Sequence, residues 1–187
     1  MSKIRTLDLC YVALFTALIT VCGWICLPLG ELKYTLQLLA VLICGGLLGW
    51  KRGLISVFAY VLLGAVGVPV FSGFSAGLFA SPTGGYIVGF LFTVIVTGLG
   101  YQFEMKDQTA KKSYWLKLLI RSLFMVLGVL LCYASATLWF ILFQGTDNAE
   151  ATLSYALFTC VAPYLWFDAL KIILALFLIE RLKKFMK

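Results

Sequence analysis

Long apolar runs with few charges limit this chain to a fold whose solvent is lipid. Of the 187 residues, 63% are hydrophobic and only 12% are charged, whereas a soluble domain is roughly half apolar and about a quarter charged. A core of this size cannot enclose the surplus. Because the runs lack alternation with period two, they predict helices, in which the backbone satisfies its own hydrogen bonds. The sequence therefore predicts an all-α integral membrane protein.

Six membrane-spanning helices can be read between the prolines, glycines and charges that interrupt the runs. The predicted spans are residues 8–27, 35–49, 54–68, 82–103, 114–143 and 163–180. The second and third spans are short for a bilayer that needs about 20 residues, so they imply tilt or shielding by protein. We expect residues 1–187 to form a single membrane domain, a six-helix bundle.

Basic residues are unevenly distributed over the connections between these spans. With the N-terminus inside, thirteen of the fifteen lysines and arginines fall on the inner side, Lys33 falls outside, and Lys171 is embedded. This bias follows the positive-inside rule. It predicts a multi-pass membrane protein with cytoplasmic N- and C-termini. The net charge of +7 is explained by topology and attraction to anionic lipid, and it does not indicate nucleic-acid binding.

Several classes of chemistry are excluded by residue types that the sequence lacks. Histidine is absent, which excludes histidine-dependent hydrolysis and ordinary histidine metal sites. The six cysteines lie mostly in apolar runs, where they act as small hydrophobic side chains. No phosphate-binding loop or nucleophile elbow is present. We expect no enzymatic activity, no metal and no cofactor, so any energy must come from a partner or an ion gradient.

The last predicted span carries an embedded acid and base, Asp168 and Lys171. Positions three apart share one face of a helix. An ionised side chain in the bilayer core costs roughly 3 kcal/mol or more, so such residues usually face a bundle interior or an aqueous cavity and mark a functional site. The other interpretation is a buried ion pair that holds helices together. A ligand with N–H and C=O groups, or with a carboxylate, would suit the pair.

Other polar and aromatic positions could complete a ligand site. Trp166 could form a wall for an apolar ligand or could anchor the span at the membrane interface. Gly84 and Gly85 precede Tyr86 at the start of the fourth span, where free backbone N–H groups favour a carboxylate or carbonyl. Gln37 is an embedded amide that could contact a ligand or make a hydrogen bond between helices.

Two outer connections are expected to be structured. Residues 69–81 are uncharged, aromatic and rich in glycine, so they are expected to fold back as a lid. The connection 144–162 contains Asp147 and Glu150 and turns apolar from Leu153, which suggests a short interfacial helix. Small residues four apart, among them Ala13 and Ala17, allow close approach of another helix.

Four stretches of the chain together resemble a known family. They are residues 34–42, 64–73, 82–90 and 168–171. In this order and spacing they are similar to BioY, the biotin-binding S component of energy-coupling factor (ECF) vitamin transporters. The resemblance implies a six-helix bundle that binds biotin near its outer face. It also implies a place in a prokaryotic cell membrane, with a transmembrane coupling protein and two ATP-binding cassette ATPases as partners.

The resemblance assigns roles to particular residues. It implies that Asp168 and Lys171 bind the ureido ring of biotin, and that Ala13 and Ala17 pack against the coupling protein. Phe71 and Gly73, which belong to one of the resembling stretches, join Gln37, Gly84, Gly85, Tyr86 and Trp166 as expected substrate-binding residues. The chain departs from the family pattern at Ala76 and Ser81, in the expected lid. An alternative function is an ion-coupled secondary transporter of a small carboxylate-bearing vitamin, with Asp168 as its proton site.

Overall fold

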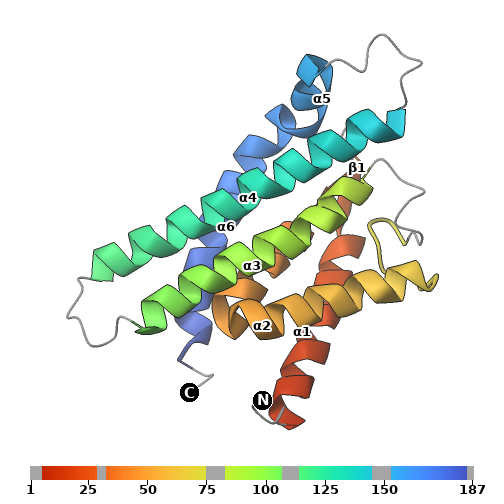
Figure 1. Ribbon diagram of the computed structural model, residues 1–187. Helices are drawn as coiled ribbons and strands as arrows, with labels where there is room; N and C mark the ends of the chain where they lie inside the picture. Colours follow the sequence, from red (N-terminus) through yellow and green to blue (C-terminus); the bar gives the residue numbers. More distant parts are fainter. Residues whose placement is uncertain (1–5, 29–32, 75–82, 107–113, 145–152, 185–187) are drawn as a thin grey trace.

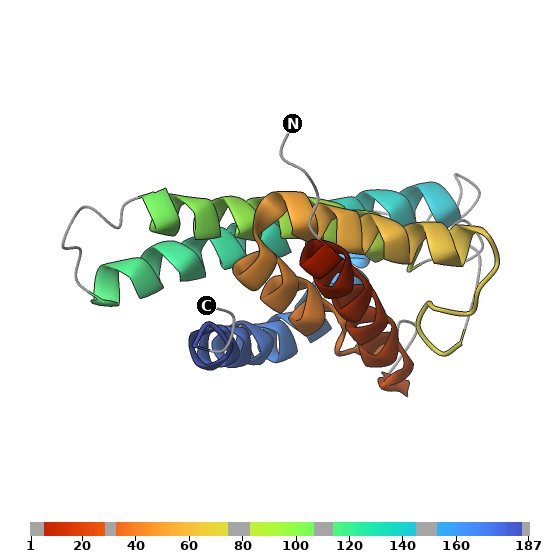
Figure 2. The ribbon, with the colours of Figure 1, turned by 90° about the horizontal axis from the view of Figure 1, so that it is seen from below.

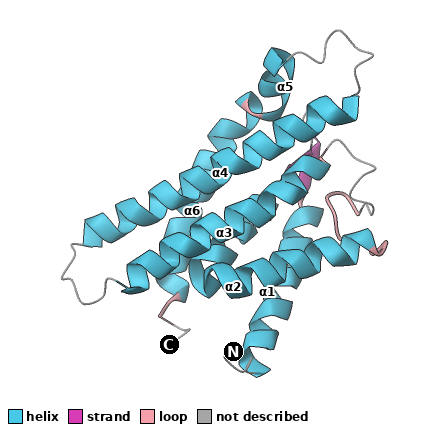
Figure 3. Cartoon of the chain, in the orientation of Figure 1, coloured by secondary structure: helices cyan, strands magenta, loops and turns pink. Residues whose placement is uncertain are grey.

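The computed structural model describes residues 6–28, 33–74, 83–106, 114–144 and 153–184, and it is almost entirely helical (Figures 1 and 3). The elements in chain order are α1 (Thr6–Trp24), β1 (Cys26–Pro28), β2 (Lys33–Thr35), α2 (Gln37–Ala65), α3 (Gly84–Lys106), α4 (Tyr114–Gln144), α5 (Leu153–Cys160) and α6 (Ala162–Leu182). Five helical segments in these ranges are long and apolar enough to cross a membrane, with 153–182 counted as one.

The predicted spans 35–49 and 54–68 form a single helix, α2, which is kinked at Gly49. Gly49 has φ 74° and ψ 176°, a backbone conformation open almost only to glycine. The chain turns sharply there, so α2 has two arms, as the orange ribbon shows in Figure 2. Gly98 of α3 lies against the backbone of Trp50 at this bend, where a Cβ atom would collide. The turn therefore comes before the predicted connection, and no loop separates the arms.

Helix α2 is the centre of the bundle because it contacts α1, α3 and α6. Helix α4 packs on the other side of α3, and α6 also contacts α4 and α5. The core between them is filled by side chains such as Leu42, Tyr60 and Val94, which are fully buried. Helix α1 begins and α6 ends at the same end of the bundle (Figures 1 and 2).

The first predicted span ends earlier than expected. Helix α1 stops at Trp24, and Cys26 to Pro28 instead form β1, which pairs antiparallel with β2. The register places Cys26 opposite Thr35 and Leu27 opposite Tyr34. This short hairpin ties the end of α1 to the start of α2, so backbone pairing between strands replaces the last helical turn.

Two of the outer connections agree with the sequence where they are described. Helix α5 lies in the connection 144–162, where a short helix was predicted. After α2, the chain folds back so that Phe71 is buried over Gly64. The remaining lid residues 75–81, with Ala76 and Ser81, the inner loop 107–113, and Asp147 and Glu150 lie outside the described residues.

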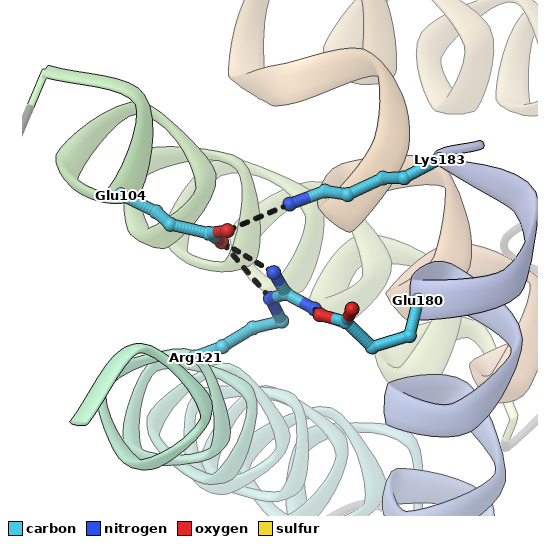
Figure 4. Close-up of polar contacts among 4 residues, drawn as sticks. All are labelled: Glu104, Arg121, Glu180 and Lys183. Carbon is cyan, nitrogen blue, oxygen red and sulfur yellow. Dashed lines mark hydrogen bonds and ion pairs between the residues drawn. The ribbon is translucent and has the colours of Figure 1, made fainter. Parts of the chain in front are cut away.

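A cluster of charged side chains joins α3, α4 and the end of α6 (Figure 4). Arg121 is only 3% exposed, and its guanidinium donates to Glu104 Oε2 from Nη2 at 2.5 Å and to Glu180 Oε1 from Nη1 at 2.7 Å. Lys183 Nζ lies 2.9 Å from Glu104 Oε1. Burial, followed by the positive charge of Arg121, lowers the pKa of Lys183. The cluster fixes three helices at the end where α6 stops.

Replacing Arg121 by Met should destabilise the fold. The change leaves Glu104 with Lys183 alone and removes the arginine from Glu180. We expect the free energy of unfolding to fall by about 3 kcal/mol, the lower end of the values typical for breaking a buried ion pair. The lower end is expected because Glu180 is partly exposed. Unfolding in detergent, followed by circular dichroism, measures the change. Lys117→Met on the same helix is the control, and equal stability of the two variants would contradict a structural role for the cluster.

Candidate functional site

A pocket opens where the starts of α2 and α3 meet the first half of α6. The cavity has a volume of about 40 Å³, and the whole cleft, including its open mouth, has a volume of about 480 Å³. The closed part holds only a few water molecules, so a larger ligand must displace lining side chains. The lining residues are Thr35, Gln37, Leu38, Ser72, Thr83, Tyr86, Ile87, Phe90, Tyr164, Asp168 and Lys171.

Asp168 is the most strongly held polar side chain in this pocket. It is 3% exposed. Lys171 Nζ donates to its Oδ1 at 2.7 Å, and the hydroxyl of Tyr133 donates to its Oδ2 at 2.6 Å. Buried charges need such partners because desolvation is costly. Each carboxylate oxygen retains further capacity to accept a hydrogen bond, so the group can bind a ligand donor without losing either protein contact.

Tyrosine rings form one wall of the pocket. Tyr34 stacks on Tyr164 with ring centroids 4.3 Å apart and an interplanar angle of 17°. Tyr86 also contacts the ring of Tyr164, with centroids 5.6 Å apart and an interplanar angle of 44°, and its hydroxyl donates to the carbonyl of Cys160. Burial, followed by the charge of Asp168, raises the pKa of Tyr34. Tyr86 and Tyr164 line the pocket, so this wall suits an apolar ring of a ligand.

Gln37 lies both at the pocket and in a hydrogen bond inside α2. Its Nε2 donates to the hydroxyl of Tyr60 at 2.5 Å, across the two arms of the helix. The Oγ1 of Thr35 is 3.4 Å from Gln37 Oε1, and the amide packs on Gly23 of α1. Gln37 therefore borders the pocket, as a ligand contact requires, and also makes a hydrogen bond between two helical arms. The two interpretations made from the sequence are compatible.

The other predicted site residues do not line the pocket. Phe71 is 2% exposed and packs edge-on against Tyr60, with centroids 5.4 Å apart. Gly73 has φ 69° in the turn after it. Gly84 begins α3, and Gly85 lies against Ala136 and Trp139 of α4. Trp166 is 84% exposed on α6, which suits a membrane-facing side chain.

Two tyrosines near Asp168, Tyr164 in the pocket and Tyr133 behind the carboxylate, were not singled out from the sequence. Tyr164 precedes Asp168 by four residues, so the shared helix face could have revealed it. Tyr133 comes from α4, and only the packing of α4 against α6 brings its hydroxyl to the carboxylate. No spacing in the sequence indicates that contact.

Ala13 and Ala17 lie on a different surface, an apolar groove between α1 and the second arm of α2. Both alanines are exposed, and the groove has an open volume of about 940 Å³. The remaining lining residues are Leu9, Val12, Thr16, Thr20, Val21, Trp24, Ala59, Leu62, Leu63, Val66, Val68 and Val70. The small side chains leave room for another helix to approach α1 closely.

The chemistry of the pocket is that of binding. It offers a carboxylate acceptor, an ammonium donor, hydroxyl groups and aromatic faces. The first turns of α2 and α3 border it, and helix starts favour negative groups. The described residues contain no cluster of three acidic, cysteine or histidine side chains that could hold a metal. A small ligand with a polar ring and an apolar body fits this set of groups.

A model of the BioY family matches residues 1–187. The chain belongs to the BioY family. It is 37% identical to the biotin transporter BioY of Thermotoga maritima, over 91% of this chain and 92% of that protein. It is 33% identical to the probable biotin transporter BioY of Pyrococcus horikoshii, over 92% and 93% of the two chains.

The fold is also similar to a solved structure. That structure is a crystal structure of the S-component for biotin from an ECF-type ABC transporter. The TM-score is 0.79 at 29% identity, and the match covers 98% of this chain and 95% of the other. This protein is therefore a multi-pass membrane protein with the fold of that S-component.

Replacing Tyr133 by Phe should lower the stability of the unliganded protein. The ring is kept, but Asp168 loses a hydrogen bond to a charged group, which contributes roughly 1.5–3 kcal/mol. Thermal unfolding in detergent measures the loss. Tyr114→Phe makes the same change on the exposed start of α4 and should have little effect. A Tyr133 variant as stable as this control would show that the carboxylate does not depend on the tyrosine.

Proposed function

We propose that this protein is a biotin-binding S component of an ECF-type vitamin transporter. It binds biotin from the outer side and delivers it through a complex with a transmembrane coupling protein and two ABC ATPases. The observation that carries the proposal is the Asp168–Lys171 pair, held in a pocket of a chain whose relatives are biotin transporters. Those relatives favour this function over ion-coupled transport.

The groups of biotin match those of the pocket. Its ureido ring has two N–H donors and a carbonyl, which suit the Asp168 carboxylate and the Lys171 ammonium. Its bicycle is apolar and suits the tyrosine wall around Tyr164. Its carboxylate suits the first turns of α2 and α3, because the start of a helix favours a negative group. The ammonium and carboxylate are only 2.7 Å apart, so they can bind neighbouring atoms of one ring.

Six passes through the membrane explain the arrangement of the helices. The two arms of α2 supply two of them, and α1, α3, α4 and α6 supply the others. An even number places both termini on one side, in agreement with the shared end of α1 and α6 (Figure 1). Thirteen of the fifteen lysines and arginines fall on the side of the termini in this topology, and the positive-inside rule then identifies that side as cytoplasmic. The pocket then lies toward the outer face, and the Arg121 cluster toward the inner face.

Coupling to ATP hydrolysis requires a partner, since the sequence has no nucleotide-binding loop. The groove at Ala13 and Ala17 is the surface proposed for the coupling protein. It is open, apolar and lined by small residues on α1. Binding there leaves the pocket accessible to ligand, because the pocket and the groove have no lining residue in common.

Replacing Asp168 by Asn should weaken biotin binding on the order of 10- to 100-fold. A charged acceptor is lost, and charged hydrogen bonds contribute roughly 1.5–3 kcal/mol. Isothermal titration of the purified protein in detergent measures the affinity. A wild type that does not bind biotin would refute the proposed function, and an unchanged affinity in a folded variant would refute the site.

The double variant Asp168→Leu with Lys171→Met is the matched control for folding. Replacing a buried ion pair by apolar side chains is often neutral for stability, so this variant should fold. A ligand raises the melting temperature only of a protein that binds it. Biotin should therefore stabilise the wild type and not the double variant. Equal stabilisation of both would show that the pair serves only to hold α6 in place.

Replacing Ala13 by Leu should leave biotin binding intact and reduce biotin uptake. The larger side chain prevents close approach of a partner helix to α1, while the ligand pocket is formed elsewhere. Co-purification with the coupling protein and uptake of labelled biotin by cells measure the effect. Leu14→Ala, at a neighbouring exposed position outside the groove, is the control. Normal assembly and uptake in the Ala13 variant would exclude this surface.

A further inference from the structure

Tyr164 carries a buried hydroxyl that has no hydrogen-bond partner. The residue is 6% exposed, and its Oη is one of two buried side-chain oxygen or nitrogen atoms left unpaired among the described residues. Leaving such a group unpaired is unfavourable, and most buried hydroxyls in proteins are paired. The exception therefore needs an explanation from the surroundings of Tyr164.

The surroundings are the ligand pocket. Tyr164 is one of its lining residues, and it lies one helical turn before Asp168 on the same face of α6. Its ring stacks on Tyr34 and contacts Tyr86, so it is packed among neighbouring aromatic rings. The other unpaired oxygen, Thr137 Oγ1, belongs to a residue of α4 that does not line the pocket.

The neighbouring tyrosines differ from Tyr164 in this respect. Tyr133 donates to Asp168, Tyr86 donates to the carbonyl of Cys160, and Tyr60 accepts from Gln37. Each of these hydroxyls contributes to holding the protein together. The hydroxyl of Tyr164 makes no such contribution in the unliganded protein, so its free hydrogen-bonding capacity is available to a ligand.

We infer that the Tyr164 hydroxyl is a third polar contact for the ligand's polar ring, beside Asp168 and Lys171. This inference rests on the proposed function and adds a specificity-determining residue to it. The ring of Tyr164 supplies the apolar wall, and the hydroxyl gains its missing partner when the ligand binds. Because the closed pocket is small, the side chains around Tyr164 separate as the ligand enters, which exposes the hydroxyl to it.

The test is Tyr164→Phe, which removes the hydroxyl and keeps the stacked ring. Affinity for biotin, measured by isothermal titration in detergent, should fall about 3- to 10-fold, as expected for one neutral hydrogen bond. The melting temperature without biotin should stay the same or rise, because an unpaired buried group is removed. Tyr11→Phe on α1, outside the pocket, should change neither quantity.

Biotinamide, in which the carboxylate is replaced by a neutral amide, locates the contact. A loss of the same factor for biotin and biotinamide supports contact with the polar ring. A loss for biotin alone would place the contact at the carboxylate and overturn the inference. Unchanged affinity for both, with a wild type that binds biotin, would overturn it while the proposed function stands. A wild type that does not bind biotin would refute both.

Discussion

The structure depends on keeping one carboxylate charged inside an apolar bundle. Asp168 is almost completely buried, and it is stabilised by an ammonium three residues away and by a tyrosine from another helix. Either partner alone would leave part of the desolvation cost uncompensated. The requirement for both fixes how α6 is rotated and how it packs against α4. The pocket around Asp168 is a consequence of that rotation.

The two ends of the bundle use buried charge differently. At the end where α6 stops, Arg121 is surrounded by Glu104 and Glu180, and its strong donors are used by protein acceptors (Figure 4). At the pocket end, Asp168 has acceptor capacity left, and Tyr164 has an unused hydroxyl. A satisfied cluster stabilises helix packing, whereas a partly satisfied one has capacity left for further hydrogen bonds. This contrast distinguishes the end closed by Arg121 from the end that contains the pocket.

The bend at Gly49 gives α2 two arms, of which one borders the pocket and the other borders the apolar groove. It lets α2 reverse direction without a loop, so Gln37 on one arm can reach Tyr60 on the other. The second arm then lies beside α1 and forms the groove that contains Ala13 and Ala17. The ligand pocket and the apolar groove therefore share one helix, and a change in the angle between its arms would alter both.

The sequence by itself determined the membrane character, the approximate helix limits and the embedded Asp168–Lys171 pair, because apolar runs and helical spacing are local properties. The motif residues also identified the family, and Gln37 and Tyr86 lie at the pocket. The sequence did not separate them from Phe71, Gly85 and Trp166, which face other surroundings. It also did not reveal the β1–β2 hairpin, Tyr133 beside Asp168, or Arg121 between two glutamates. Those features depend on which helix faces are brought together, and only tertiary packing decides that.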